Sequence, residues 1–303
     1  MAVYVVGDFL RETRLRKGYT QEEVSYGICT PASLSRIENG MQKPGRLILE
    51  KLFERLGTEN NLFNSFVSKE EMELYLEIQT LIRNVTDGDL HRIEEQIDIV
   101  EKLTQNASEL ERQSLFWAKG TLAAQKYGNN EKAMEWLMRA IRITLPDFDG
   151  KNPLRNHLLT FDEITIINSI AVRYAENEDL LTAIQLNMWL KEYMENRIVD
   201  GKMKTTKYPM ILYNLSCWLG DENCHKEAVK MADEGIEFCV RYGNLALFPL
   251  LIFNKGSALA ELDRTSEARN YLHQSITIFK SMNKDQQVKI AIDWCKTHYG
   301  IVF

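Results

Sequence analysis

The sequence predicts an all-α protein with a small N-terminal head and a long array of paired helices behind it. Only six prolines and sixteen glycines occur among 303 residues, so most stretches are free of helix breakers, which favours long helices over short strands. Small residues recur at helical spacing through the C-terminal part of the chain. The length exceeds that of one average domain, which suits two units or a repeat array.

The composition is that of a soluble protein. Hydrophobic residues make up 45% of the chain and charged residues 26%, enough apolar material to bury a core. Charges at Asp8, Arg11 and Glu12 interrupt the apolar start of the chain. A secretory segment or a membrane span is therefore not expected there, and we expect a cytoplasmic protein without a membrane partner.

The cysteines and histidines do not form a ligand pattern. The five histidines are scattered, and the cysteines include no CxxC pair. Widely spaced cysteines in odd number are typical of reduced, packed thiols. We expect no metal site and no cofactor. The cysteines are Cys29, Cys217, Cys224, Cys239 and Cys295.

The charge is distributed unevenly. The whole chain has a net charge of -6, but residues 1–67 hold nine Lys/Arg and eight Asp/Glu, which gives a head of +1 and a body of -7. Basic residues cluster locally at Arg11, Arg14, Arg16 and Lys17. Because phosphate contacts act over about a Debye length, this balance is compatible with DNA binding by the head.

The head begins with two predicted helices. Residues 6–17 place Val6 and Leu10 on one helical stripe, and Gly18 ends this helix. Thr20 with Glu23 forms a capping box that starts a second helix over 21–26. Gly27 follows and closes it.

A third helix is predicted over 31–38, because Thr30 can cap it and Pro31 suits its first position. Leu34 and Ile37 are expected to pack inward, and Asn39 with Gly40 ends the helix. The exposed flank would hold Ala32, Ser33 and Arg36. A further helix completes a small core with Leu49, Leu52, Phe53 and Leu56.

Two helices joined by a three-residue turn can place the second helix in the major groove of DNA. An ordinary helical hairpin would share this topology. The run TQEEVS, a turn, LSRIENG and a following proline resembles the Cro/C1 and Xre type of helix-turn-helix, the lambda-repressor-like fold, over residues 6–57.

The resemblance assigns roles to individual positions. It implies that Gln21 meets phosphate and steadies the recognition helix, and that Arg14 and Glu38 form a structural ion pair. The base edges would be read by Pro31, Ala32, Ser33 and Arg36, and phosphates would be met by Ser35 and Lys43. The complete set of DNA-binding candidates is Gln21, Thr30, Pro31, Ala32, Ser33, Ser35, Arg36 and Lys43.

Two positions depart from this pattern. Ile28 stands where the turn usually has glycine, and Pro31 stands where a polar base-reading side chain is common. The first could alter the turn, and the second reduces direct readout. Sequence-specific binding would then rest mainly on Ser33 and Arg36.

A linker separates head and body. Residues 57–69 place turn residues around a short apolar cluster, for which we predict a short helix. Ser68 and Glu71 form another capping box, which opens the next helix. We therefore predict a DNA-binding domain over 1–67 and a repeat domain over 68–303.

The repeat domain is predicted from paired small residues. Ala171 and Ala183, Ser216 and Ala228, and Gly256 and Ala268 are each twelve residues apart, which lets two helices approach closely. These units resemble tetratricopeptide repeats, which form a right-handed superhelix. We predict five repeats and a last helix over 285–299 that caps the array or builds a dimer interface. The repeats span 70–104, 112–145, 160–197, 208–242 and 248–280.

The concave side of such a superhelix would carry the first helix of each pair. Asn214 and Asn254 lie two residues before the small residue of their repeats, and Asn168 lies three before Ala171. An amide side chain can donate to and accept from a peptide backbone at once. These asparagines could also be solvated or cap local turns. The peptide-binding candidates are Asn168, Tyr213, Asn214, Cys217, Phe253 and Asn254.

A head of this type followed by such repeats resembles the peptide-pheromone-responsive regulators of Gram-positive bacteria, the group of Rgg, PlcR and PrgX, and the head is most similar to the PlcR-like type. The resemblance implies a homodimer, an inverted-repeat operator on double-stranded DNA and a short signalling peptide in the concave groove, as in quorum sensing. We hypothesise that the peptide changes the superhelical pitch and so alters the separation of the two heads.

Two other functions remain open. The groove could hold a partner protein that the head recruits to DNA. Some repeat proteins related to this group act on phosphorylated response regulators, which would make the protein an enzyme. The sequence shows no nucleophile and base spaced for chemistry and no phosphate-cradling glycine loop, so we expect a non-enzymatic transcription regulator.

Overall fold

The computed structural model describes residues 6–58, 69–105, 108–197 and 201–303, with the side chains of 201–203 left aside. All regular structure in these ranges is α-helical. By contacts, the chain forms two units, which are residues 1–177 with 197–200, and residues 178–196 with 201–303. The predicted boundary at 67/68 and the predicted linker helix lie outside the described residues, so both remain predictions.

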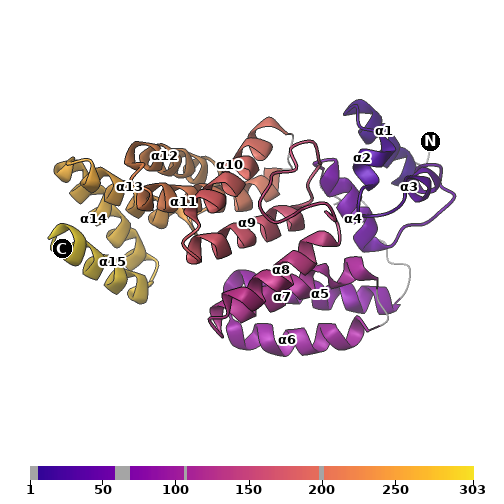
Figure 1. The fold of residues 1–303 in the computed structure, drawn as a ribbon, viewed down its shortest axis with the longest axis horizontal. Helices are drawn as coiled ribbons and strands as arrows, with labels where there is room; N and C mark the ends of the chain where they lie inside the picture. Colours follow the sequence, from indigo (N-terminus) through magenta and orange to yellow (C-terminus); the bar gives the residue numbers. More distant parts are fainter. Residues whose placement is uncertain (1–5, 59–68, 106–107, 198–200) are drawn as a thin grey trace. The chain divides into compact units, whose positions relative to one another are not determined.

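The first unit contains the head and the first helices of the array (Figure 1). The predicted head helices are confirmed to within one residue at most ends. The head consists of α1 (Val6–Arg16), α2 (Gln21–Ser25), α3 (Pro31–Glu38) and α4 (Arg46–Arg55). The helices behind it are α5 (Lys69–Asp87), α6 (Leu90–Leu103), α7 (Glu109–Gln125), α8 (Asn130–Arg142) and α9 (Phe161–Glu176).

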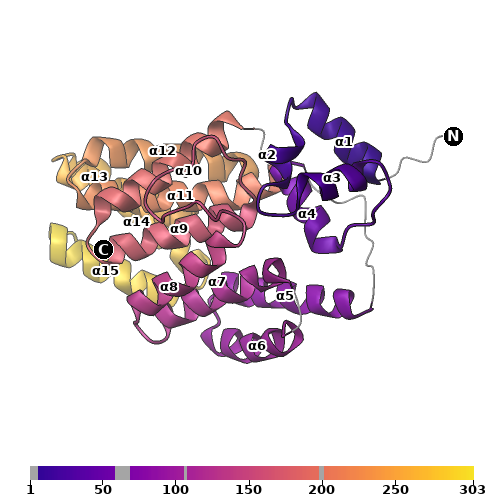
Figure 2. The same ribbon diagram turned by 45° about the vertical axis from the view of Figure 1, so that its right-hand side comes forward.

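The second unit is a row of further helices. Its members α13, α14 and α15 lie side by side in the views of both Figure 1 and Figure 2. Helix α15 packs on α14, where Ala291 and Cys295 join Leu272 and Ile276 in one apolar cluster. The helices are α10 (Leu180–Asn196), α11 (Gly201–Asp221), α12 (His225–Tyr242), α13 (Phe248–Glu261), α14 (Thr265–Ser281) and α15 (Asp285–Tyr299).

The small residues allow close helix packing, as predicted. A Cβ added at Gly256 would lie 2.8 Å from Cγ of Leu272 on α14. The same holds at Gly120 of α7, where the added atom would lie 3.0 Å from Cγ of Leu137. Because real Cβ atoms rarely approach other atoms this closely, glycine fits these crossings without displacing a neighbour.

Helix α11 begins earlier than predicted, at Gly201 rather than near 208, and contains Pro209. A proline inside a helix leaves the carbonyl four residues before it without its usual partner. That carbonyl belongs to Thr205, and the Asn244 side chain donates to it over 2.7 Å. The helix therefore continues through the proline, because a side chain from beyond α12 replaces the lost hydrogen bond.

The head has its own core, to which a distant loop contributes. Leu10, Leu34 and Leu52 are fully buried there. Leu158, from the long segment between α8 and α9, joins the same cluster and is 3% exposed. The segment that joins α8 to α9 thus packs into the head through Leu158.

Candidate DNA-reading helix and ligand pocket

Helix α3 presents one face to solvent. Thr30 caps it by accepting a hydrogen bond from the backbone N–H of Ser33 over 3.1 Å, and Pro31 occupies its first turn. Leu34 and Ile37 are buried, as predicted. The other side of the helix carries Pro31, Ala32 and Arg36, which are exposed, and Ser33 and Ser35, which are half-buried.

A buried ion pair fixes α3 against α1. Nε and Nη2 of Arg14 donate to the two oxygens of Glu38 over 2.6 and 2.8 Å, which confirms the pair that the resemblance implied. This hydrogen bonding raises the pKa of Arg14, so its positive charge is secured. Gln21 also donates to Glu38, over 2.7 Å. Glu38 therefore joins α3 to both α1, through Arg14, and α2, through Gln21.

The turn between α2 and α3 has its glycine one position earlier than the usual pattern. Gly27 adopts a φ of 67°, which glycine reaches without steric cost. Ile28 is then free to point inward and is 9% exposed in the head core. The departure noted at Ile28 leaves the motif intact because Gly27 takes over the turn conformation.

Lys43, the last DNA-binding candidate, is exposed in the loop between α3 and α4. Arg36, near the end of α3, and Lys43, in the loop that follows, are both exposed cations. Two cations beside a helix that can enter a groove suit one base contact and one phosphate contact.

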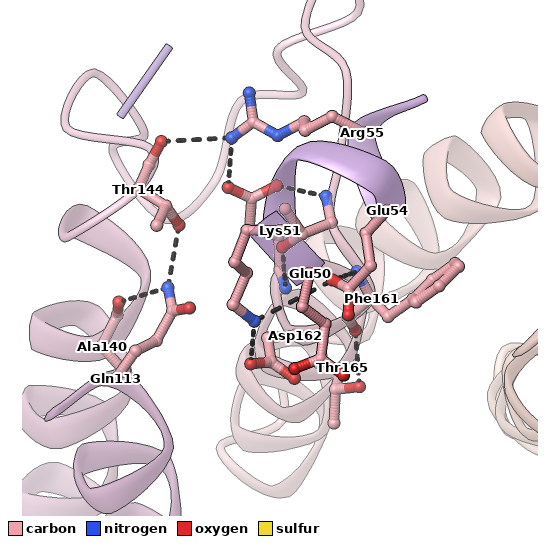
Figure 3. A network of polar contacts seen from close by, with 12 residues as sticks. Glu50, Lys51, Glu54, Arg55, Gln113, Ala140, Thr144, Phe161, Asp162 and Thr165 are labelled. Atoms are coloured by element: carbon pink, nitrogen blue, oxygen red, sulfur yellow. Dashed lines mark hydrogen bonds and ion pairs between the residues drawn. The ribbon is translucent and has the colours of Figure 1, made fainter. Parts of the chain in front are cut away.

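The opposite side of the head is joined to the start of α9 (Figure 3). Nη2 of Arg55 donates to Oε1 of Glu163 over 2.6 Å, and both side chains are 0% exposed. Glu163 is also the third residue of the α9 capping box, where its other oxygen accepts from the backbone N–H of Thr160. One carboxylate thus caps α9 and holds α4.

Two more contacts surround this pair. Lys51 of α4 forms an ion pair with Asp162, and Oε2 of Glu54 accepts from the backbone N–H of Phe161 over 3.1 Å. Burial raises the pKa of Glu54 to about 8. The backbone N–H groups at the start of α9 carry a partial positive charge, which favours hydrogen-bond acceptors such as Oε2 of Glu54 there. We call the set Lys51, Glu54, Arg55, Asp162 and Glu163 the α4–α9 junction.

The turn of the head takes part in the same docking. Tyr26 donates to a carboxylate oxygen of Asp147, and its ring lies 4.7 Å from that of His157. A Cβ at Gly27 would lie 2.1 Å from the carbonyl oxygen of Thr144. Burial, with the hydrogen bond to Asp147, raises the pKa of Tyr26 to about 12. The docked surface therefore comprises the end of α2 and α4 and leaves the outer face of α3 exposed.

The second unit holds a pocket of about 510 Å³. Three helices, α11, α13 and α15, each line it with side chains four residues apart, which lie on one helical face. Each row runs from an apolar or aromatic residue through a middle residue to a polar one. The rows are Tyr213, Cys217 and Asp221, then Phe253, Ser257 and Glu261, then Ile290, Trp294 and His298.

The structure brings together part of the predicted peptide-binding set. Tyr213, Cys217, Phe253 and Asn254 line the pocket. Asn214 is half-buried but does not line it. Asn168 is only 5% exposed and lies on α9, which belongs to the first unit. Four of the six predicted residues therefore line this pocket, and the assignment of Asn168 and Asn214 to peptide binding stays a prediction.

Asn254 has a structural contact as well as a place in the pocket. Its Nδ2 donates to Oγ of Ser216 over 2.8 Å, so it joins α13 to α11. Among the described residues no donor reaches its Oδ1, which can still accept from a ligand. The prediction for Asn254 stays open, with one half of the amide already used.

The contribution of α15 to the pocket was not predicted. We expected this helix to cap the array or to build a dimer interface, although Ile290, Trp294 and His298 repeat the four-residue spacing of the two earlier rows. A comparison of the last helix with the first helix of each earlier repeat would have identified these three residues as candidates for the pocket lining. Trp294 stacks on His298 with ring centroids 3.7 Å apart.

Other candidate chemistry is limited. Within the described ranges, no group of three or more His, Cys, Asp or Glu side chains could hold a metal ion. The five cysteines are free thiols there, and burial raises the pKa of Cys217 to about 11, which keeps it a thiol at neutral pH. None of the helices searched in the described part of the chain is long and apolar enough to span a membrane.

Comparison with known proteins identifies relatives for both parts. A helix-turn-helix family matches residues 10–59. The uncharacterized HTH-type transcriptional regulator YqaF of Bacillus subtilis is 38% identical over 63 residues, which cover 20% of this chain and 83% of that protein. The head is therefore a helix-turn-helix domain.

The whole chain is similar to PlcR of Bacillus thuringiensis. The crystal structure of PlcR with the peptide PapR7 and DNA matches with a TM-score of 0.63 at 19% identity, over 96% of this chain and 99% of that one. The apo form of PlcR matches with a TM-score of 0.59 at 18% identity, over 95% and 98%. The fold of head and repeats is thus shared. The RNPP family C-terminal domain matches residues 82–299, and the chain therefore belongs to the RNPP family.

Proposed function

We propose that this protein is a transcriptional regulator whose binding to an operator is controlled by a short signalling peptide. The observation that carries the proposal is the pairing, in one chain, of an outward-facing α3 with a ligand-sized pocket on the second unit. Family membership supports it, because a relative of the same fold was crystallised with a peptide and DNA.

The DNA-binding part follows from α3. Its exposed Arg36 is the candidate for bidentate contact with a guanine, and Ser33 can reach either kind of base. Lys43 and Ser35 would contact phosphates, and Gln21 would do so while bonded to Glu38. Pro31 and Ala32 would let the helix backbone approach the base edges. A single head with so few reading side chains would bind weakly.

We therefore propose a homodimer on an inverted-repeat operator. In a dimer, two heads can bind half-sites that lie about 34 Å apart, which is one turn of the DNA helix. The contacts of both heads then contribute to the affinity. The protein would do this in the cytoplasm, where a bacterial chromosome is accessible, and without an enzymatic activity of its own.

The peptide would bind in the pocket of the second unit. A volume of about 510 Å³ lies in the range of small-ligand pockets, roughly 300–1,000 Å³. The aromatic side chains of Tyr213, Phe253 and Trp294 offer apolar contact, and Asn254 offers one acceptor to a peptide backbone. A bound peptide would change the spacing of the two heads, because it stabilises one of two conformations of the chain.

Selection of DNA from a random pool by the purified full-length protein tests the proposal. We expect an enriched inverted repeat whose affinity changes when peptide-containing culture supernatant is added. Enrichment without symmetry would contradict the dimer. An affinity that is the same with and without supernatant, and with a library of synthetic heptapeptides, would contradict control by a peptide.

A further inference from the structure

One end of the pocket carries two carboxylates at equivalent positions. Asp221 ends α11 and Glu261 ends α13, and each lies five residues after the small residue of its repeat, Ser216 or Gly256. Both line the pocket. The C-terminus of a helix adds a partial negative charge of its own. The two helix ends and the two carboxylates therefore make this end of the pocket negative.

Cations do not balance these charges. None of the described residues that line the pocket is a lysine or an arginine. The titratable groups that share the lining are His225, His298, Cys217 and two tyrosines. In the described part of the chain the polar contact of Asp221 is with the thiol of Cys217, over 3.9 Å, and an ion pair to Asp221 or Glu261 is not formed there.

This arrangement favours a cationic ligand. Asp221 and Glu261 are both exposed and so are open to a ligand, and desolvation by the surrounding pocket raises the pKa of Asp221. A cation that donates hydrogen bonds to such a carboxylate makes a charge-assisted contact, which is stronger than a hydrogen bond between neutral groups. The opposite end of each row, Tyr213, Phe253 and Ile290, is apolar. The pocket is thus polarised from apolar to acidic.

We propose that the signalling peptide carries a positively charged group, an Arg or Lys side chain or its own α-amino group, which binds between Asp221 and Glu261. A large apolar side chain of the same peptide packs on Phe253 and Trp294. This inference rests on the proposed function, because it specifies the chemistry of the ligand for the same pocket.

Synthetic heptapeptide mixtures test it on the full-length protein. Each mixture carries a C-terminal dye, random apolar residues and one fixed residue, which is Arg, Lys, Leu or Glu, and fluorescence anisotropy gives the dissociation constant. We expect the Arg and Lys mixtures to bind about tenfold more tightly than the Leu mixture, the size of one charge-assisted contact, and the Glu mixture to bind most weakly. Acetylated versions of each mixture separate the α-amino group from the side chain as the source of the cation.

Variants locate the effect. In the double variant Asp221→Asn, Glu261→Gln, the preference for Arg and Lys is expected to vanish while binding of the Leu mixture persists. Glu227→Gln, an exposed carboxylate of α12 outside the pocket, is the matched control and should keep the preference. Thermal unfolding checks that each variant folds.

The outcomes separate this inference from the proposed function. Equal binding of all mixtures with and without acetylation, tightest binding of the Glu mixture, or a preference for the cationic group that survives in the double variant would overturn the cationic ligand and leave a peptide pocket standing. Failure of every mixture to bind would overturn the peptide part of the proposed function, and this inference with it.

Discussion

Arg36 is the side chain on which base reading depends most. It is exposed on the outer face of α3, next to Pro31 and Ala32, which cannot donate a hydrogen bond from a side chain. Replacing Arg36 with Ala is expected to lower affinity for the selected operator by about 1–3 kcal/mol and to relax the preference at one base pair.

The measurement is operator binding by anisotropy, with Arg241→Ala as control. Arg241 is an exposed arginine of α12, far from the head in sequence. An equal loss for specific and random DNA would show that Arg36 contacts phosphate and does not read a base.

The ion pair between Arg14 and Glu38 belongs to the fold. Both side chains are buried, 9% and 1% exposed, so removing one partner leaves a charge without compensation. Arg14→Ala is expected to destabilise the head by about 3–5 kcal/mol, measured by urea unfolding with far-UV circular dichroism. A loss below 1 kcal/mol would mean that Gln21 alone satisfies Glu38.

At the scale of elements, the α4–α9 junction holds the head to the array, and its stability should depend on pH. Burial raises the pKa of Glu54 to about 8, while an unfolded glutamate has a pKa of about 4.3. The folded state then binds the proton more tightly, so the contribution of Glu54 is present below the unfolded pKa and is lost as the pH rises towards 8.

Comparison with Glu54→Gln isolates this contribution, because glutamine keeps the shape of a neutral carboxyl group. Between pH 5.5 and 7.5 the unfolding free energy of the native protein should fall relative to the variant by about 2–3 kcal/mol. Parallel curves for the two proteins would show that Glu54 is ionised in the folded state.

Gly27 is the second element-scale test, and Gly18 offers a matched control. Both adopt left-handed conformations, with φ of 67° and 75°, but a Cβ at Gly27 would collide with Thr144, whereas a Cβ at Gly18 has nothing within 4 Å. Gly18→Ala should cost about 1–2 kcal/mol, the cost of that conformation for alanine. Gly27→Ala should cost more and should undock the head.

Hydrogen exchange of the Phe161 amide reports the docking, because this N–H donates to Glu54 of α4. We expect faster exchange at Phe161 in Gly27→Ala and native exchange in Gly18→Ala. Identical exchange in the two variants would show that the head is not held at this turn.

The head could be predicted closely because its signals are local. Thr20 with Glu23 and Thr30 with Pro31 fix where α2 and α3 begin, within a few residues of the helices they start. The junction could not be predicted in this way. Arg55 and Glu163 are 108 residues apart, and neither stands in a pattern that points to the other.

Part of the pocket lining could also be predicted from the sequence. Equivalent positions in two repeats pointed to Tyr213 and Phe253, because a repeat copies its geometry along the chain. The repeat spacing did not show that Tyr213 faces the pocket and the adjacent Asn214 does not, although one step along a helix turns a side chain by about 100°. The last helix escaped the pattern because α15 has no second helix to complete a pair.

At the scale of the whole molecule, the head and the pocket lie in different units. A ligand in the second unit can act on DNA binding only if two conformations of the chain differ in their affinity for it. Because coupling between two binding sites is reciprocal, the factor by which the peptide changes operator affinity must equal the factor by which the operator changes peptide affinity.

That reciprocity gives the most direct test of the central claim. Using the tightest-binding heptapeptide from the mixtures and the selected operator, calorimetric titration of the full-length protein yields each dissociation constant with and without the other ligand. We predict that the operator changes the dissociation constant of the peptide by the same factor as the peptide changes that of the operator, and that this factor is about 5- to 150-fold. Ratios of one in both directions, with both ligands binding, would contradict control of this regulator by a peptide in its pocket.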